Sequence, residues 1–169
     1  MIKPTEKVPS LSIDLVNGTR WVLGDQRPDQ FTMMIFYRGL HCPVCKKYLE
    51  RLQTKLPEFT DVGVNVIAIS MDSEKRAKKT YEKWDIEDIP LGYGLDEATA
   101  RNLGLYISHA IKDEEPDVFS EPGLFLVNPD GTLYGSAIQT MPFARPEFDA
   151  LIKAITFVKD EGYPARGGK

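Results

Sequence analysis

The sequence predicts one α/β domain over residues 1–169, with a mixed central sheet and helices on both of its faces. Residues 31–37 form a nearly continuous apolar run, which is typical of a strand covered on both faces. After it the pattern becomes helical up to Pro57, with four apolar residues on one face, Tyr48, Leu49, Leu52 and Leu56. Residues 62–71 read as a second buried strand, so we expect a βαβ unit of parallel strands.

The flanking segments complete this fold. Apolar residues alternate over 11–15 and resume at 21–23 after Asn17-Gly18, which predicts an N-terminal β-hairpin outside the main repeat. Residues 73–84 predict a helix capped by Ser73 or Asp72, and residues 96–103 a short helix that stops at Gly104.

The C-terminal part predicts a hairpin and a last helix. Residues 124–127 and 133–138 flank the turn sequence Pro129-Asp130-Gly131, and residues 148–158 are amphipathic. Residues 162–169 read as a loose tail. This order matches a thioredoxin-like fold with an N-terminal hairpin extension.

Composition excludes several classes of partner. The 169 residues are 42 % hydrophobic and carry a net charge of -4. No apolar run approaches the roughly 18 residues of a membrane span, and residues 1–9 lack the features of a secretory signal, so we expect a cytoplasmic protein without a membrane partner. The lysines of residues 74–83 alternate with acidic residues, which argues against nucleic acid as a partner.

The two cysteines, Cys42 and Cys45, are the strongest functional signal. They form a C-x-x-C motif where a strand passes into a helix, in a chain with too few cysteines for a disulfide scaffold. With Pro43 at the first helical position, Cys42 takes the N-cap, where backbone donors and the helix dipole favour a thiolate. Cys45 lies one turn further on, so we expect a Cys42–Cys45 disulfide with Cα atoms about 4.4 to 6.8 Å apart. For disulfide substrates we favour Cys42 as the attacking thiolate and Cys45 as the resolving thiol.

Other interpretations of these residues carry less weight. A zinc site from Cys42, Cys45, His41 and His109 is disfavoured because no second C-x-x-C exists and adjacent residues point poorly at one ion. We therefore expect no metal and no cofactor. Arg38 could bring positive charge to a sulfur or a peroxide oxygen, and a protonated His41 could help to hold a thiolate. Both Arg38 and His41 could equally be solvated side chains of a loop, without a role in the chemistry.

Residues 36–45 (FYRGLHCPVC) and 122–131 (PGLFLVNPDG) resemble the peroxiredoxin-like branch of the alkyl hydroperoxide reductase and thiol-specific antioxidant family. The resemblance extends into residues 163–167 and implies thiol-dependent peroxide or disulfide reduction. In thioredoxin-like oxidoreductases a cis-proline precedes the late strand and faces the cysteines. Pro122, 80 residues after Cys42, takes that place, so we expect it to be cis.

The sequence also departs from the peroxiredoxin pattern. Arg38 stands where the family has proline, Cys42 where it has threonine, and Pro122 where it has arginine. In that alignment Cys45 matches the peroxidatic cysteine, whereas the thioredoxin alignment makes Cys42 the nucleophile. The sequence thus predicts a redox enzyme that uses a peroxide or disulfide substrate and is re-reduced by thioredoxin, glutathione or a similar thiol. The alternative is a noncatalytic redox sensor or binding module. The sequence is also compatible with a homodimer.

Overall fold

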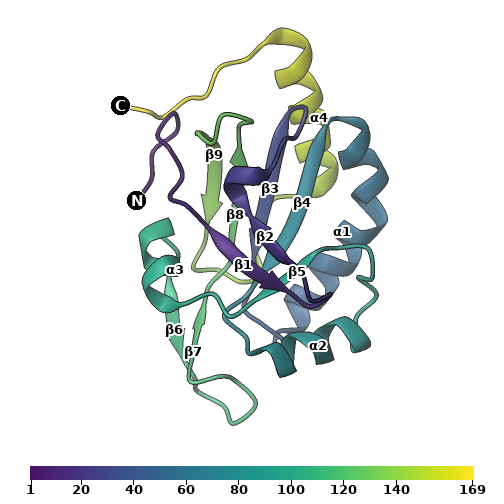
Figure 1. The fold of residues 1–169 in the computed structure, drawn as a ribbon, viewed down its shortest axis with the longest axis vertical. Helices are drawn as coiled ribbons and strands as arrows, with labels where there is room; N and C mark the ends of the chain where they lie inside the picture. Colours follow the sequence, from purple (N-terminus) through teal and green to yellow (C-terminus); the bar gives the residue numbers. More distant parts are fainter.

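The computed structural model describes residues 1–169 and contains a seven-stranded mixed sheet, a separate two-stranded sheet and four α-helices (Figure 1). The strands are β1 (Ser12–Leu15), β2 (Arg20–Val22), β3 (Phe31–Phe36), β4 (Val64–Ile69), β5 (Leu91–Tyr93), β6 (Ile107–His109), β7 (Val118–Ser120), β8 (Gly123–Val127) and β9 (Leu133–Ile138). The helices are α1 (Pro43–Asp61), α2 (Glu74–Lys83), α3 (Glu97–Leu103) and α4 (Phe148–Glu161), with a short 3-10 helix at Leu23–Asp25.

The large sheet has the strand order β2-β1-β5-β4-β3-β8-β9. β3 and β4 run parallel, with Ile35 opposite Ala68, which confirms the βαβ unit. β8 and β9 form the expected antiparallel hairpin. The N-terminal hairpin is also present as predicted, outside the βαβ unit, and β1 pairs with β5 so that the hairpin extends the sheet at one edge.

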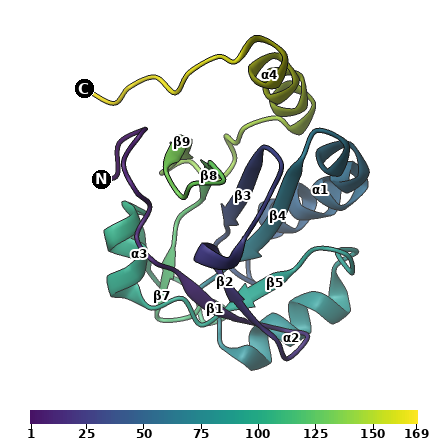
Figure 2. The same cartoon turned by 45° about the horizontal axis from the view of Figure 1, so that its top comes forward.

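Two apolar layers cover the sheet. Alternate side chains of β3 point to opposite faces, so Met33 and Ile35 pack in one buried cluster while Met34 and Phe36 pack in the other. The first cluster holds α1 and α4, and the second holds α3 together with residues from the N-terminal segment. Figure 2 shows α1 and α4 on one side of the sheet and α3 on the other, which confirms helices on both faces.

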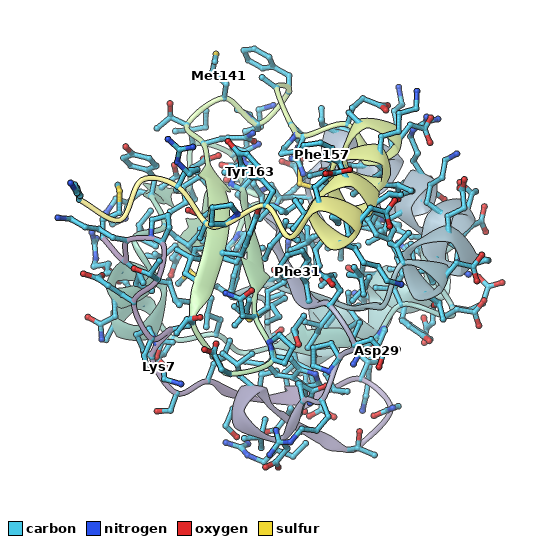
Figure 3. All side chains as sticks on the ribbon, turned by 90° about the horizontal axis from the view of Figure 1, so that it is seen from above. Lys7, Asp29, Phe31, Met141, Phe157 and Tyr163 are labelled. Atoms are coloured by element: carbon cyan, nitrogen blue, oxygen red, sulfur yellow. A yellow bond between two sulfur atoms is a disulfide. The ribbon has the colours of Figure 1, made fainter.

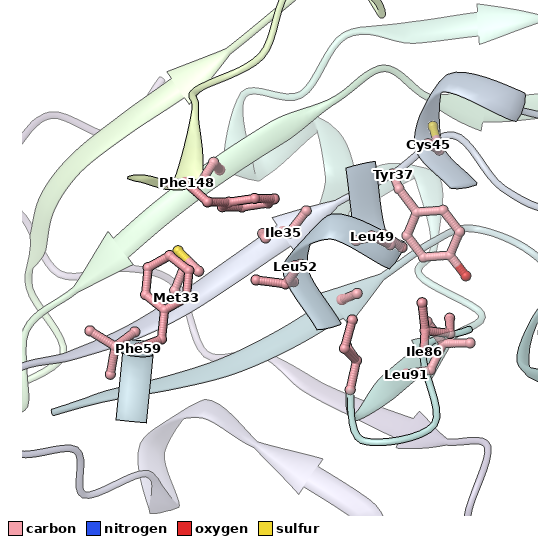
Figure 4. Packing of buried hydrophobic residues seen from close by; sticks show 14 of the residues in the cluster. Met33, Ile35, Tyr37, Cys45, Leu49, Leu52, Phe59, Ile86, Leu91 and Phe148 are labelled. Atoms are coloured by element: carbon pink, nitrogen blue, oxygen red, sulfur yellow. The ribbon is translucent and has the colours of Figure 1, made fainter. Parts of the chain in front are cut away.

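Helix α1 is longer than the sequence predicted. It continues through Pro57 to Asp61, so the expected end at Pro57 is wrong. A proline inside a helix removes one backbone hydrogen bond, but here the last turn also buries Phe59 completely. Figure 4 shows Phe59 at one end of this packed core and Cys45 at the other, near Tyr37 and Leu49. Tertiary packing therefore outweighs the local preference.

The remaining helix ends follow local chemistry. Ser73 caps α2, since its Oγ accepts the backbone N–H of Arg76 at 3.3 Å, and Gly104 ends α3 in the left-handed conformation at φ 87°. After α4, Tyr134 donates its hydroxyl to the carbonyl oxygen of Tyr163 at 3.0 Å, near the aromatic contact of Tyr163 with Phe157 that can be followed in Figure 3. None of the helices has the length and apolar character needed to cross a bilayer.

Candidate active site

The two cysteines lie where β3 passes into α1. Cys42 and Cys45 form a disulfide with their Cα atoms 5.2 Å apart, as the sequence predicted. Both are buried, at 1 % and 0 % exposure. Helix α1 begins at Pro43 with this bond closed, so the oxidised pair fits inside a regular first turn.

Cys42 occupies the N-cap of α1, which confirms the predicted position. Its Sγ accepts the backbone N–H of Cys45 at 3.2 Å, and Pro43 takes the first helical position, where a missing N–H costs nothing. One backbone donor and the helix dipole therefore act on this sulfur.

Arg145 is the one cationic side chain that hydrogen-bonds to the pair, and sequence reasoning missed it. Its Nη2 donates to Cys45 Sγ at 3.0 Å, from the loop between β9 and α4. The guanidinium carbon lies 5.1 Å from the ring centroid of Tyr48, whose hydroxyl donates to the carbonyl oxygen of Pro146 at 2.6 Å. Burial lowers the pKa of Arg145 to about 10, so the guanidinium stays charged at neutral pH. A full positive charge thus faces Cys45.

Arg38 points its charge elsewhere. Its Nε lies 3.2 Å from Glu121 Oε2, and its guanidinium lies over the ring of Phe119 at 4.9 Å. Glu121 is buried and also accepts the hydroxyl of Ser108 at 2.7 Å. Arg38 forms no hydrogen bond with either sulfur, and its closest acidic partner is Glu121.

His41 lies beside the disulfide as a ring packed on Phe119, with centroids 4.7 Å apart. Burial and then the charge of Arg38 lower the pKa of His41, which disfavours the protonated form that a charge-stabilising role requires. Both ring nitrogens lack a hydrogen-bond partner. His109 lies apart on β6, and the structure has no group of three or more histidine, cysteine and acidic side chains that could hold a metal ion.

Pro122 differs from its prediction, because the chain has no cis peptide bond and the expected cis-proline is therefore wrong. The backbone on both sides is held by sheet-like bonds: Glu121 N–H donates to the carbonyl of Tyr106 at 2.7 Å, and Gln139 N–H donates to the carbonyl of Pro122 at 3.0 Å. An ordinary trans bond satisfies both contacts. Pro122 instead lines a small cavity together with Arg145.

Asp72 fixes the loop that leads into the cysteines. Its buried carboxylate accepts the backbone N–H of Leu40 at 2.8 Å and the Nε of Arg76 at 2.9 Å. Gly39 has φ +133°, and a Cβ there would lie 2.7 Å from Asp72 Oδ1. The sequence offered Asp72 only as a helix cap, whereas the structure makes it the anchor of the active-site loop.

The disulfide site and the fold together define a class of protein. The model of the AhpC/TSA family matches residues 4–136, so the chain belongs to this family. Membership supports an antioxidant thiol peroxidase with a thioredoxin fold. A comparison with curated protein sequences found no match.

Three solved structures illustrate the shared fold. Peroxidoxin BcpB from Mycobacterium tuberculosis is 18 % identical with a TM-score of 0.77, over 94 % of this chain and 99 % of that one. Enterococcus faecalis AhpC is 18 % identical with a TM-score of 0.76, over 98 % and 99 %. Xanthomonas campestris Peroxiredoxin Q is 23 % identical with a TM-score of 0.70, over 87 % and 90 %. At these identities the likeness shows the fold.

Proposed function

We propose that Cys45 is the sulfur that attacks peroxide, that Arg145 activates it, and that Cys42 resolves it. The observation that carries this assignment is the 3.0 Å contact between Arg145 Nη2 and Cys45 Sγ. A buried guanidinium stabilises a thiolate more than a single backbone N–H does, because it adds the attraction of a full positive charge to the hydrogen bond. The trans Pro122 also removes the thioredoxin-like feature that supported Cys42 as the nucleophile, and leaves only its N-cap position in favour of that role.

The reaction proceeds in three balanced steps. The Cys45 thiolate attacks the outer peroxide oxygen, the O–O bond breaks, and the leaving alkoxide takes a proton, which yields Cys45 sulfenic acid and an alcohol or water. The Cys42 thiolate attacks the sulfenic sulfur and releases hydroxide, which becomes water on protonation, as the disulfide forms. A thiol reductant then restores the dithiol at the cost of its own oxidation.

Cys42 is suited to the resolving role by distance. Because the disulfide closes within the first turn of α1, with 5.2 Å between Cα atoms, resolution requires no unwinding of the helix. The Arg145 contact also leaves Cys45 better stabilised as a thiolate than Cys42, which has the N–H of Cys45 and the helix dipole but no hydrogen bond from a cation. We place this cycle in a reducing compartment such as the cytoplasm, with thioredoxin, glutathione or a similar thiol as reductant.

Two single substitutions test the assignment. We expect Cys42→Ser to accumulate a Cys45 sulfenic acid after one equivalent of hydrogen peroxide, detected by dimedone labelling and mass spectrometry. Cys45→Ser should show no rapid peroxide reaction. Sulfenic acid on Cys42 in the Cys45→Ser protein, with none on Cys45 in the reciprocal variant, would reverse the roles.

A second candidate function is disulfide reduction initiated by Cys42. The N-cap position of Cys42, with its Sγ accepting the N–H of Cys45, favours it. A side-by-side assay with hydrogen peroxide and a protein disulfide separates the two activities. A noncatalytic sensor would instead consume one equivalent of oxidant and then stop.

A further inference from the structure

An open cleft of about 500 Å³ lies beside the active-site loop, on the side of His41. Cations from two helices line it: Lys46 in the first turn of α1, and Arg76 and Lys83 of α2. Trp84 forms an apolar part of the wall, and Glu114 is the only acidic residue in the lining. In a chain with a net charge of -4, this is a local concentration of positive charge.

These cations have unused binding capacity. Lys46 and Lys83 take part in none of the ion pairs of the chain. Arg76 uses its Nε for Asp72, while its buried Nη2 has no hydrogen-bond partner. The two ring nitrogens of His41 are also unpartnered. Because these three nitrogens are buried, the cleft presents to an anion mainly the free ammonium groups of Lys46 and Lys83.

The residues that line the cleft flank the disulfide along the sequence. Leu40 and His41, which line it, directly precede Cys42, and Lys46 directly follows Cys45. Arg145 does not line the cleft, and the sulfur that it contacts is that of Cys45. The site therefore has a cationic cleft at its Cys42 end and a guanidinium at Cys45.

We propose that this cleft binds the carboxylate groups of a small thiol, which reduces the Cys42–Cys45 disulfide by attack on Cys42. The proposal rests on the proposed function above, because it names the class of reductant that closes the same cycle. A carboxylate offers acceptor oxygens to Lys46 and Lys83, beside the positive charge of Arg76. Opposite charge also concentrates an anionic thiol near the disulfide.

The position of Arg145 determines which sulfur is attacked. In thiol–disulfide exchange the better-stabilised sulfur leaves, and Cys45 has the guanidinium 3.0 Å away. The incoming thiolate forms a bond to Cys42 Sγ, and the disulfide electron pair passes to Cys45 as a thiolate. A second thiolate then attacks the incoming sulfur, which gives the oxidised small-molecule disulfide and a Cys42 thiolate. Since Cys42 is 1 % exposed, attack requires local opening of the loop that Asp72 holds through the backbone N–H of Leu40.

A stoichiometric reduction assay tests the proposal without any peroxide. The oxidised full-length protein is mixed with mercaptosuccinate, 2-mercaptoethanol or cysteamine, which are anionic, neutral and cationic thiols. Alkylation and mass spectrometry then follow the loss of the disulfide, with rates corrected for each thiol's thiolate fraction. We expect mercaptosuccinate to react about tenfold faster than 2-mercaptoethanol at low ionic strength, with cysteamine slowest and the differences reduced at about 1 M salt.

Charge-removing substitutions locate the effect. Lys46→Gln and Lys83→Gln should each lower the mercaptosuccinate rate about threefold and leave the 2-mercaptoethanol rate unchanged. Lys75→Gln and Lys79→Gln are matched controls, because both lysines are exposed on α2 and outside the cleft lining, and these variants should retain the full preference. Circular dichroism verifies folding of each variant.

Two results would overturn the proposal: equal corrected rates for the three thiols, or an equal loss of preference in the control variants. The proposed function is assayed separately, by peroxide consumption with dithiothreitol as a neutral reductant. A chain that prefers mercaptosuccinate but does not turn over peroxide would retain the cleft assignment and refute the peroxidase assignment.

Discussion

Replacement of Arg145 by glutamine measures how strongly this side chain activates Cys45. The substitution removes the charge that lies 3.0 Å from the sulfur but keeps a polar side chain. A hydrogen bond to a charged group contributes about 1.5 to 3 kcal/mol, and every 1.4 kcal/mol is a factor of ten. We therefore expect the thiolate reaction of Cys45 to slow by about tenfold to a hundredfold at pH 7. Arg145→Lys keeps the charge but loses the planar guanidinium, so its reaction rate should lie between those of the parent protein and Arg145→Gln.

The assay is iodoacetamide alkylation of reduced protein as a function of pH, in a Cys42→Ser background so that one thiol reacts. Loss of Arg145 should move the midpoint of the alkylation curve to higher pH and slow hydrogen peroxide reduction in parallel. Arg51→Gln is the matched control, because Arg51 is a half-exposed arginine of α1 that pairs with Glu147 and does not contact the sulfurs. If the Arg145→Gln and Arg51→Gln curves coincide with that of the parent, Arg145 does not activate Cys45 and the proposed assignment fails.

Three further substitutions probe the frame of the site. Gly39→Ala should destabilise the fold by about 1 to 3 kcal/mol in urea titration, because of its positive φ and the contact with Asp72, whereas Gly135→Ala, in open space, should change stability little. Phe148→Ala should cost about 3 to 5 kcal/mol in the same titration, since this fully buried ring anchors α4; a loss under 1 kcal/mol would contradict that. Burial lowers the pKa of His41 below its ordinary 6.5, so the unfolded state takes up the proton first and stability falls as pH drops below about 6.5. His41→Gln should flatten that decline in thermal melts at pH 5 to 7, and an unchanged slope would show that other groups cause it.

Local sequence signals predicted the parts of the fold that bury long apolar runs. The six buried residues of β3 and the helical spacing of α1 are both readable over a few turns of chain. Strands β5, β6 and β7 were missed because three residues are too few to show a period of two. Partner strands and adjacent helices, rather than local pattern, fix these short elements.

In the candidate site, too, the sequence predicted only the residues that carry a local signal. Cys42 and Cys45 were identified because their spacing, the preceding strand and Pro43 are all local features. Arg145 was missed because it is 100 residues from Cys45 in sequence and reaches it only through the loop before α4. Nothing in the residues around Arg145 distinguishes it from an ordinary surface arginine.

The disulfide between Cys42 and Cys45 closes a very short loop, and this limits what oxidation can do to the rest of the molecule. Chain-entropy arguments assign a loop of this size about 2 kcal/mol of stabilisation, against nearly 5 kcal/mol for a loop of 100 residues. Helix α1 is already formed around the closed bond. Oxidised and reduced protein should thus have similar shapes, with the oxidised form melting about 4 to 8 °C higher. A partner that distinguishes the two states would have to recognise the sulfur atoms and their immediate neighbours, since the surface far from the disulfide should be the same in both states.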